Sequence, residues 1–171
     1  LRKIDEIILS TVTDPTQIAQ QVANVVVVDA GFKGVVILLL DKKDNSLVRL
    51  AVSRTEDIER AENESHRTFQ GIRTPLTADN NIVVRSIKER AMQVTHNLFD
   101  VLTPHFTQEE SNKIQEIVGI TSSLIYPLIV RGEIIGAMII SIGENEENLS
   151  QYERDLISRL SGVVGIAMDN A

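Results

Sequence analysis

The sequence SSLIYPLIVRGEIIGAMIISI, residues 122–142, decides the fold of this chain. Two apolar runs rich in Ile and Val, residues 120–131 and 133–142, are separated only by Gly132. Parallel strands need a connection of about a dozen residues or more, whereas antiparallel strands can be joined by a tight turn. We therefore predict an antiparallel hairpin in this part of the chain.

A long amphipathic helix is predicted to follow the hairpin, over residues 150–171. Ser150 and Glu153 have the spacing of a capping box, in which the two side chains satisfy free amides at the start of a helix. The apolar residues after them recur at helical spacing and would form a stripe that packs on a sheet: Tyr152, Leu156, Leu160, Val163, Val164 and Ala167. Gly162 and Gly165 cost about 1 kcal/mol each relative to alanine in a helix, so we expect them to permit close approach of another element.

Two further helices are predicted at the start of the chain, over residues 1–30. The first begins with apolar residues on one helical stripe: Leu1, Ile4 and Ile8. Asp14 followed by Pro15 is typical of the start of a second helix, and Gly31 is typical of its end. Residues 25–28 are β-branched and would suit a strand, but the helical spacing of the apolar residues around them favours a helix.

Strands and short helices alternate in the middle of the chain. Strands are predicted over residues 34–41, 47–53 and 91–95, and helices over residues 56–67, over residues 82–90 and from a capping box of Thr107 and Glu110. Residues 69–81 show no clear period and are predicted to form a loop. Because helices at both ends of the chain accompany antiparallel strands, we predict an α+β sandwich.

The strand predicted over residues 47–53 has one half-polar face. Val48, Leu50 and Val52 would point to one side of the sheet, and the other side would carry the remaining residues: Leu47, Arg49, Ala51 and Ser53. Such a face is either a solvated edge of the sheet or the wall of a pocket.

The length of the chain indicates one domain that covers residues 1–171, because 171 residues lie near the usual size of a single domain. Its parts would be the helices of residues 1–30, the sheet of residues 34–142 and the helix of residues 150–171. The chain starts at Leu1 rather than Met, and its last helical pattern has no stop signal. We therefore expect a domain excised from a longer protein.

Charge and composition exclude several classes of function. With 24 acidic against 17 basic residues, the net charge of −7 would repel nucleic acid and anionic lipid. No apolar run approaches the ~20 residues of a membrane span, so we expect no membrane contact and a cytoplasmic location. Cysteine is absent, which excludes disulfides, thiolate metal sites and cysteine nucleophiles.

The end of the sequence resembles the closing hairpin and last helix of a GAF domain. That family has an aliphatic run ending in Pro-Leu, a short turn, Ile-Gly before the last strand, and a helix entered through a Ser cap. Residues at the matching places are Pro127, Leu128, Gly132, Ile135, Gly136 and Ser150. The helix from Thr16, the strand from Gly34 and the strand ending at Asn97 fit the same order, so the resemblance covers nearly the whole chain.

The resemblance implies a GAF-like sandwich, related to the PAS fold, with a central antiparallel sheet of five or six strands. The terminal helices would cover one face, and short helices and loops would enclose a ligand pocket on the other. GAF domains sit in sensor kinases, cyclases, phosphodiesterases and transcriptional activators, and often dimerise through their terminal helices. The resemblance thus implies a sensor attached to a signalling output domain, such as the histidine kinase of a two-component system.

The sequence departs from the better-understood branches of the family. Bilin-binding members and members that reduce free methionine sulfoxide need a Cys, which this chain lacks. Cyclic-nucleotide-binding members carry Asn-Lys, Phe and Asp-Glu, whereas Phe106 is followed by Thr107, Gln108, Glu109 and Glu110. We therefore expect neither a bilin, nor a Cys-ligated metal, nor a cyclic nucleotide, and leave the cofactor unassigned.

Polar residues that could converge on a pocket are the candidate ligand-binding residues: Arg49, Ser53, Arg73, Asn80, Arg85 and Thr95. Arginine suits a carboxylate or a phosphate because it forms paired hydrogen bonds. The alternative is that each of them is a solvated polar position. Candidate dimer-interface residues lie on the terminal helices: Leu1, Ile4, Ile8, Leu156, Leu160 and Val163.

Three functions follow as hypotheses. The first is a regulatory domain that senses a small molecule and relays its occupancy through the terminal helices. The second is a structural dimerisation module without a ligand. The third is a haem-based gas sensor with His96, at the end of a predicted strand, as the axial ligand. An enzyme is disfavoured, because no pair of groups is spaced for acid, base or nucleophile chemistry.

Overall fold

Residues 14–170 are described by a computed structural model of the chain. The first predicted helix, which includes Leu1, Ile4 and Ile8, lies outside the described residues. No helix of the described part is long and apolar enough to cross a membrane.

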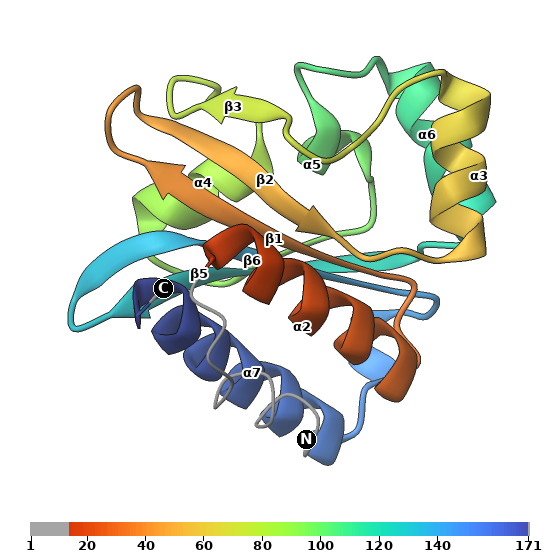
Figure 1. The fold of residues 1–171 in the computed structure, drawn as a ribbon. Helices are drawn as coiled ribbons and strands as arrows, with labels where there is room; N and C mark the ends of the chain where they lie inside the picture. Colours follow the sequence, from red (N-terminus) through yellow and green to blue (C-terminus); the bar gives the residue numbers. More distant parts are fainter. Residues whose placement is uncertain (1–13, 171) are drawn as a thin grey trace.

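A six-stranded sheet forms the centre of the structure (Figure 1), and every neighbouring pair of strands is antiparallel. Its order is β3-β2-β1-β6-β5-β4. The strands are β1 (Gly34–Asp41), β2 (Ser46–Val52), β3 (Arg73–Pro75), β4 (Gln93–Thr95), β5 (Ser122–Val130) and β6 (Glu133–Ile142). The prediction of an α+β sandwich with an antiparallel sheet is confirmed.

The β5–β6 hairpin confirms the prediction made from residues 122–142, with a connection of two residues instead of one. Val130 pairs with Glu133, and both residues between them, Arg131 and Gly132, have positive φ (51° and 80°). Positive φ at both central positions is the requirement of a type I′ turn, whose twist matches that of the strands. The hairpin is therefore determined locally.

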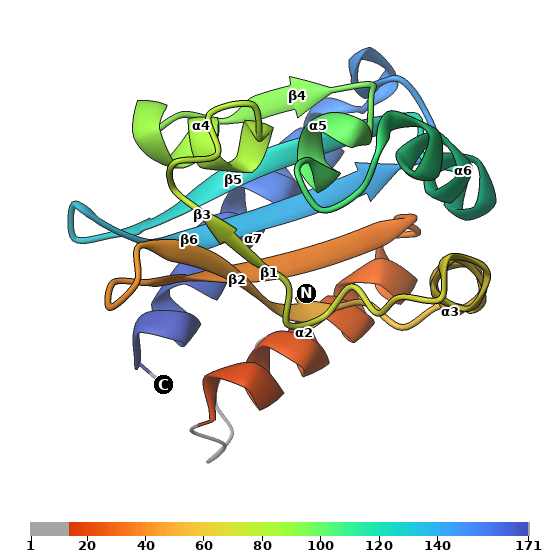
Figure 2. The same cartoon turned by 90° about the horizontal axis from the view of Figure 1, so that it is seen from above.

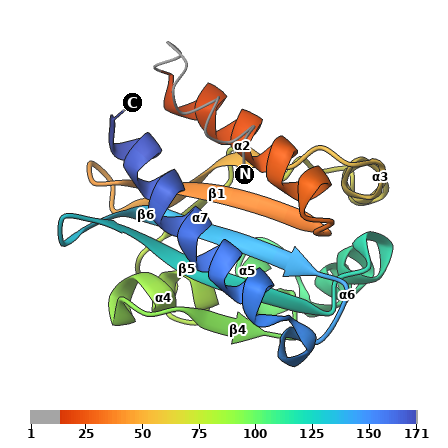
Figure 3. The same cartoon turned by 90° about the horizontal axis from the view of Figure 1, so that it is seen from below.

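One face of the sheet is covered by α2 (Pro15–Asp29) and α7 (Gln151–Asn170), which lie side by side (Figure 3). Their apolar stripes pack with inward residues of β1, β5 and β6 in one aliphatic core. Residues 25–28 lie in the helix α2, as predicted. Leu156 and Leu160, which were predicted as dimer-interface residues, are buried in this core within the single chain, and Val163 is partly buried against it.

The other face carries α3 (Glu56–Ser65), α4 (Ile82–Glu89), α5 (Phe99–Leu102) and α6 (Gln108–Val118), as Figure 2 shows. A second apolar core lies between these helices and the sheet. A short 3₁₀ helix, η1 (Glu146–Asn148), precedes α7. Helices α3 and α4 end slightly earlier than predicted, because His66 and Arg90 adopt left-handed conformations that terminate them.

Besides η1, two elements were not predicted. The loop expected over residues 69–81 contains β3, which pairs with β2, and α5 forms between β4 and α6. Both are only three or four residues long, so neither has a period that a sequence pattern could reveal.

A bulge in β2 changes the predicted alternation of its side chains. Ile37 of β1 is paired with Ala51, but the next residue, Leu38, is paired with Arg49, so that Leu50 is extra. Arg49 and Val52 consequently point to the face of α3–α6, whereas Ala51 packs in the core beneath α2 and α7. The prediction that Ala51 and Ser53 share a face with Arg49 is wrong for this reason.

Candidate functional site

A small cavity lies inside the second core, between the sheet and the helices α3, α5 and α6. Its volume is about 50 Å³. Val36, Val52 and Ile139 form part of its sheet side, and residues of the helices and loops line its other side: Ile58, Phe69, Leu98, Val101, Leu102, Ile114, Val118 and Ile120. Gly34, Arg49 and Ser141 complete the lining. The wall is almost entirely apolar.

Arg49 is the charged residue of this wall. Only 6% of its surface is exposed, and its Nη2 donates one hydrogen bond, 3.4 Å long, to the carbonyl of Val101. Within residues 14–170 it takes part in no ion pair. Burial lowers the pKa of Arg49 to about 10, which still leaves the guanidinium protonated at neutral pH.

The backbone of Arg49 is held on the outer side of β2. Its amide donates to the carbonyl of Ile72 (3.0 Å), and its carbonyl accepts from the amide of Gly71 (2.8 Å). The adjacent bulge at Leu50 turns the strand. The backbone of Arg49 is thus tied on one side, and its side chain extends to the other side, where it lines the cavity and reaches the Val101 carbonyl.

Asn81 holds residues 101–103, the part of α5 and its end that Arg49 contacts at Val101. Its Oδ1 accepts from the amides of Val83 and Val84 at the start of α4, and its Nδ2 donates to the carbonyls of Val101 (2.9 Å) and Thr103 (2.8 Å). All these groups are buried. One amide side chain therefore caps α4 and fixes α5 over the cavity.

Gln115 of α6 fixes the segment just before α5, at His96 and Leu98. Its Oε1 accepts from the amide of Leu98 (2.9 Å), and its Nε2 donates to the carbonyls of His96 (2.9 Å) and Ile120 (3.1 Å). Neither role was predicted from the sequence. The N-cap position of Asn81 before an apolar run was a usable signal, whereas the contacts to distant carbonyls had none.

A partly buried imidazole lies near Arg49. His105 Nε2 is 3.1 Å from the Thr74 hydroxyl. Partial burial lowers the pKa of His105, and the positive charges of Arg49 and Arg67 lower it further. Arg67 donates to the carbonyl of His105 (2.6 Å) and lies over the ring of Phe106, 3.9 Å from its centroid. Two positive charges, those of Arg49 and Arg67, thus act on the imidazole of His105.

The family model that describes the GAF domain matches residues 12–169. This match spans nearly the whole chain, and it agrees with a sheet that has helices α2 and α7 on one face and a small apolar cavity on the other. The chain belongs to the GAF domain family. GAF domains are in general regulatory, sensory modules.

Solved structures share the fold of this GAF domain at low sequence identity. One is a methyl-accepting chemotaxis protein, residues 122 to 287, with 20% identity and a TM-score of 0.68, over 97% of this chain and 94% of that one. Another is the phycocyanobilin-bound GAF domain from a cyanobacterial phytochrome, with 17% identity and a TM-score of 0.66, over 98% and 90% of the two chains.

A third similar structure is that of an enzyme. The free methionine-R-sulfoxide reductase from Neisseria meningitidis, in complex with its substrate, has 14% identity and a TM-score of 0.65, over 98% of this chain and 84% of that one. The present sequence matches none of the curated proteins with which it was compared. The structural likenesses therefore establish the fold of this GAF domain and leave its ligand open.

Of the six predicted ligand-binding residues, Arg49 alone lines the cavity. Ser53 is fully buried, but its Oγ accepts a hydrogen bond from the amide of Val35 (3.0 Å) and so closes the end of the β1–β2 pair. Thr95 is also buried, and its hydroxyl donates to Asp100 (2.7 Å). Both side chains satisfy internal groups.

The other three candidates lie near the surface. Arg73 forms ion pairs with Asp41 (3.1 Å) and Asp44 (2.9 Å) across the β1–β2 turn. Asn80 lines a separate, open hollow of about 380 Å³ beside Thr103 and Pro104. Arg85 contacts the carbonyl of Asn80 (3.3 Å). The predicted convergence of all six residues on one pocket does not occur.

His96, the candidate haem ligand, lies on the outside of the GAF domain. Its Nε2 is 2.6 Å from Glu146 Oε2, and just over half of its side chain is exposed. It does not line the cavity. The structure gives the haem hypothesis no support, because this imidazole is directed toward a surface carboxylate.

Proposed function

We propose that this GAF domain senses a small molecule in the cavity beside Arg49 and relays its occupancy through α2 and α7 to an attached output domain. The single observation that supports this proposal is a buried guanidinium without an ion-pair partner among residues 14–170, facing an otherwise apolar cavity. A histidine kinase of a cytoplasmic two-component system is the type of output that we infer.

The relay would pass through the two central strands. Val36 of β1 and Ile139 of β6 line the cavity, whereas the residues on either side of them face the opposite core: Val35, Ile37, Met138 and Ile140. That core includes the inward faces of α2 and α7. A ligand that moves β1 or β6 therefore changes the packing under both helices, and coupling of about 1–3 kcal/mol is usual for such transmission.

A thermal-shift screen tests the proposal, with a library that contains anionic, neutral and cationic small molecules. Binding to the folded state raises the melting temperature. For each hit, hydrogen exchange should become slower in β1, β6, α2 and α7. A library without a single hit would contradict the sensor proposal, and protection confined to α3, α5 and α6 would contradict the relay.

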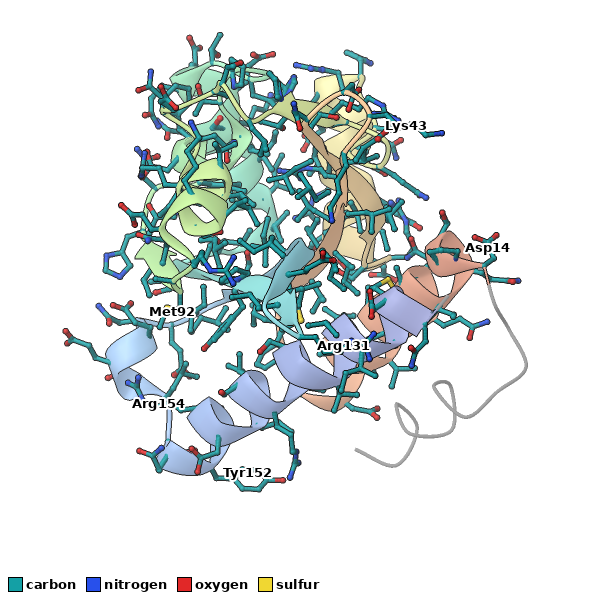
Figure 4. The ribbon with its side chains drawn as sticks, turned by 90° about the vertical axis from the view of Figure 1, so that its left-hand side faces the viewer. Asp14, Lys43, Met92, Arg131, Tyr152 and Arg154 are labelled. Carbon is teal, nitrogen blue, oxygen red and sulfur yellow. The ribbon has the colours of Figure 1, made fainter. Side chains whose placement is uncertain are left out.

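A second candidate function is dimerisation through α7. Tyr152 is 73% exposed and Ile166 is 52% exposed, and Tyr152 points away from the body of the protein (Figure 4). Gly162 lies between them on the same helix, and no described atom lies within 4 Å of a Cβ built there. An exposed helical glycine between exposed apolar residues suits close approach of a second helix.

Sedimentation velocity tests this second function. We expect a dimer at micromolar concentration that Ile166→Lys converts to a monomer. The matched control is Val28→Lys, on the exposed side of α2, which should leave the dimer intact. A wild-type protein that sediments as a monomer at hundreds of micromolar would exclude dimerisation through this domain.

A further inference from the structure

We propose that the ligand of this domain is a short-chain monocarboxylate of two or three carbons, whose carboxylate pairs with Arg49. This inference rests on the sensor function proposed above and adds the chemical class of the ligand. It follows from three properties of the cavity: its one unpaired charge, its apolar wall and its size.

The positive charge of Arg49 favours an anionic ligand. The guanidinium carries five N–H donors, and one hydrogen bond to Val101 occupies it in the described residues. A buried charge without a partner is unfavourable, which is why proteins nearly always pair such groups. A carboxylate would accept two parallel hydrogen bonds from the planar fork and neutralise the charge. Arg49 therefore has the geometry of a ligand anchor.

The rest of the wall limits the ligand to a single charge. Ser141 is the other lining residue with a polar side chain, and its Oγ lies 2.8 Å from Ser123 Oγ, which engages the hydroxyl. Every remaining lining residue is aliphatic, aromatic or glycine. A dicarboxylate or a phosphate dianion would bury a second negative charge without a partner. The part of the ligand beyond the carboxylate must then be apolar.

The volume limits the number of atoms. One water needs roughly 10–15 Å³ of such space, so the 50 Å³ of this cavity would hold about three to five water-sized atoms. A carboxylate group uses three of them, which leaves space for about one or two further carbons. Acetate and propionate meet all three conditions.

The experiment compares acids with their neutral isosteres on the purified domain. Melting temperatures are measured with 20 mM sodium acetate, propionate, hexanoate or phosphate, and with acetamide or propionamide, at constant ionic strength. Such concentrations are needed because ligands of so few atoms bind weakly. We expect acetate and propionate to raise the melting temperature by about 3–6 °C, and the amides, hexanoate and phosphate to raise it by less than 1 °C.

Two variants assign the effect to the cavity. Arg49→Met keeps an unbranched side chain but removes the guanidinium and its charge, so it should abolish the response to propionate. Without ligand it should melt no lower than the wild type, because it removes an unpaired buried charge. Arg85→Met is the matched control on α4, outside the cavity, and should respond as the wild type does.

A measurement on the unaltered protein makes the test independent of how the variants fold. In methyl NMR spectra, propionate should shift the signals of Val36, Val52 and Ile139 on the cavity wall. The signals of Val22 and Val26 of α2, which lie in the opposite core, should shift less.

Several results would overturn the inference. They are equal stabilisation by propionamide, a larger effect of phosphate or hexanoate, a response that survives in Arg49→Met, or propionate shifts confined to residues outside the cavity. If the acids fail but another class of compound from the library binds in the cavity, the ligand class is wrong and the sensor function stands. If no compound of any class binds, both proposals fail.

Discussion

The two glycines inside α7 have different surroundings. A Cβ on Gly165 of α7 would lie 3.3 Å from Val130 Cγ2 and 3.8 Å from Leu128 Cβ. At Gly162 it would meet no described atom. The expectation that both glycines permit close approach is therefore confirmed within the domain for Gly165, which allows α7 to approach β5.

The two glycines of α7 should respond in opposite directions to alanine. Gly162→Ala should raise the free energy of unfolding by about 0.5–1 kcal/mol, because alanine is the better helix former and the site is open. Gly165→Ala should lower it, since the added methyl group is too close to Val130 and overpacking costs about 1–3 kcal/mol. Urea unfolding measures both. Equal effects of the two substitutions would contradict this description of α7.

His105 makes the stability of the domain dependent on pH. Its pKa lies below the ordinary value because of partial burial and, to a smaller extent, the charges of Arg49 and Arg67. Below about pH 6.5 the unfolded chain takes up a proton that the folded domain does not yet bind. The free energy of unfolding should therefore fall as the pH is lowered from 7 to 5.5.

Urea unfolding at a series of pH values checks this prediction. His105→Gln, which keeps a polar partner for Thr74, should reduce the slope in this range. The pKa of Glu146 is lowered chiefly by its hydrogen bond with His96, so the contribution of Glu146 to the free energy of unfolding is lost only at more acidic pH. A slope that stays the same in His105→Gln would contradict the assignment.

At the scale of elements, both helices with a predicted capping box start where the box places them. The amide of Ser150 donates to Glu153 Oε1 (3.0 Å), and the amide of Glu153 donates to Ser150 Oγ (3.1 Å). Thr107 and Glu110 form the same pair of bonds at α6. These starts are local, since each depends on residues three apart.

Removal of the cap should destabilise the domain moderately. Ser150→Ala should lower the free energy of unfolding by about 0.5–2 kcal/mol, as measured by urea unfolding. Ser150→Asp is the control and should retain most of the stability, because aspartate also caps helices and a negative charge at this end interacts favourably with the helix dipole. A loss as large in Ser150→Asp as in Ser150→Ala would show that the cap does not contribute.

At the scale of the whole molecule, β1 and β6 hold the two cores together. They are adjacent central strands, and their side chains alternate between the core under α2 and α7 and the core under α3–α6. Gly136 of β6 lies directly against the backbone of Leu38 and Leu39, so close that a Cβ there would collide with the Leu38 carbonyl oxygen. A substitution at Gly136 therefore affects the packing of both cores.

Gly136→Ala should therefore weaken the entire domain. The added methyl group must separate β1 from β6, and we expect the free energy of unfolding to fall by more than about 3 kcal/mol, with faster hydrogen exchange in the helices of both layers. The control is Gly71→Ala, in a loop where a Cβ meets open space, which bears only the cost of its positive φ. Loss of one layer alone would show that the two cores unfold independently.

The sequence by itself determined the elements whose causes are local: the β5–β6 hairpin, the capped helices α6 and α7, and the antiparallel α+β class. These depend on turn residues, caps and periodicity within a few positions. The tertiary structure alone decided the site. The bulge at Leu50 places Arg49 on the cavity side of β2 and Ser53 on the other side, and the side chains of Asn81 and Gln115 donate to backbone carbonyls distant in the sequence. Such choices depend on which segments meet across the sheet, and no pattern along the chain encodes that meeting directly.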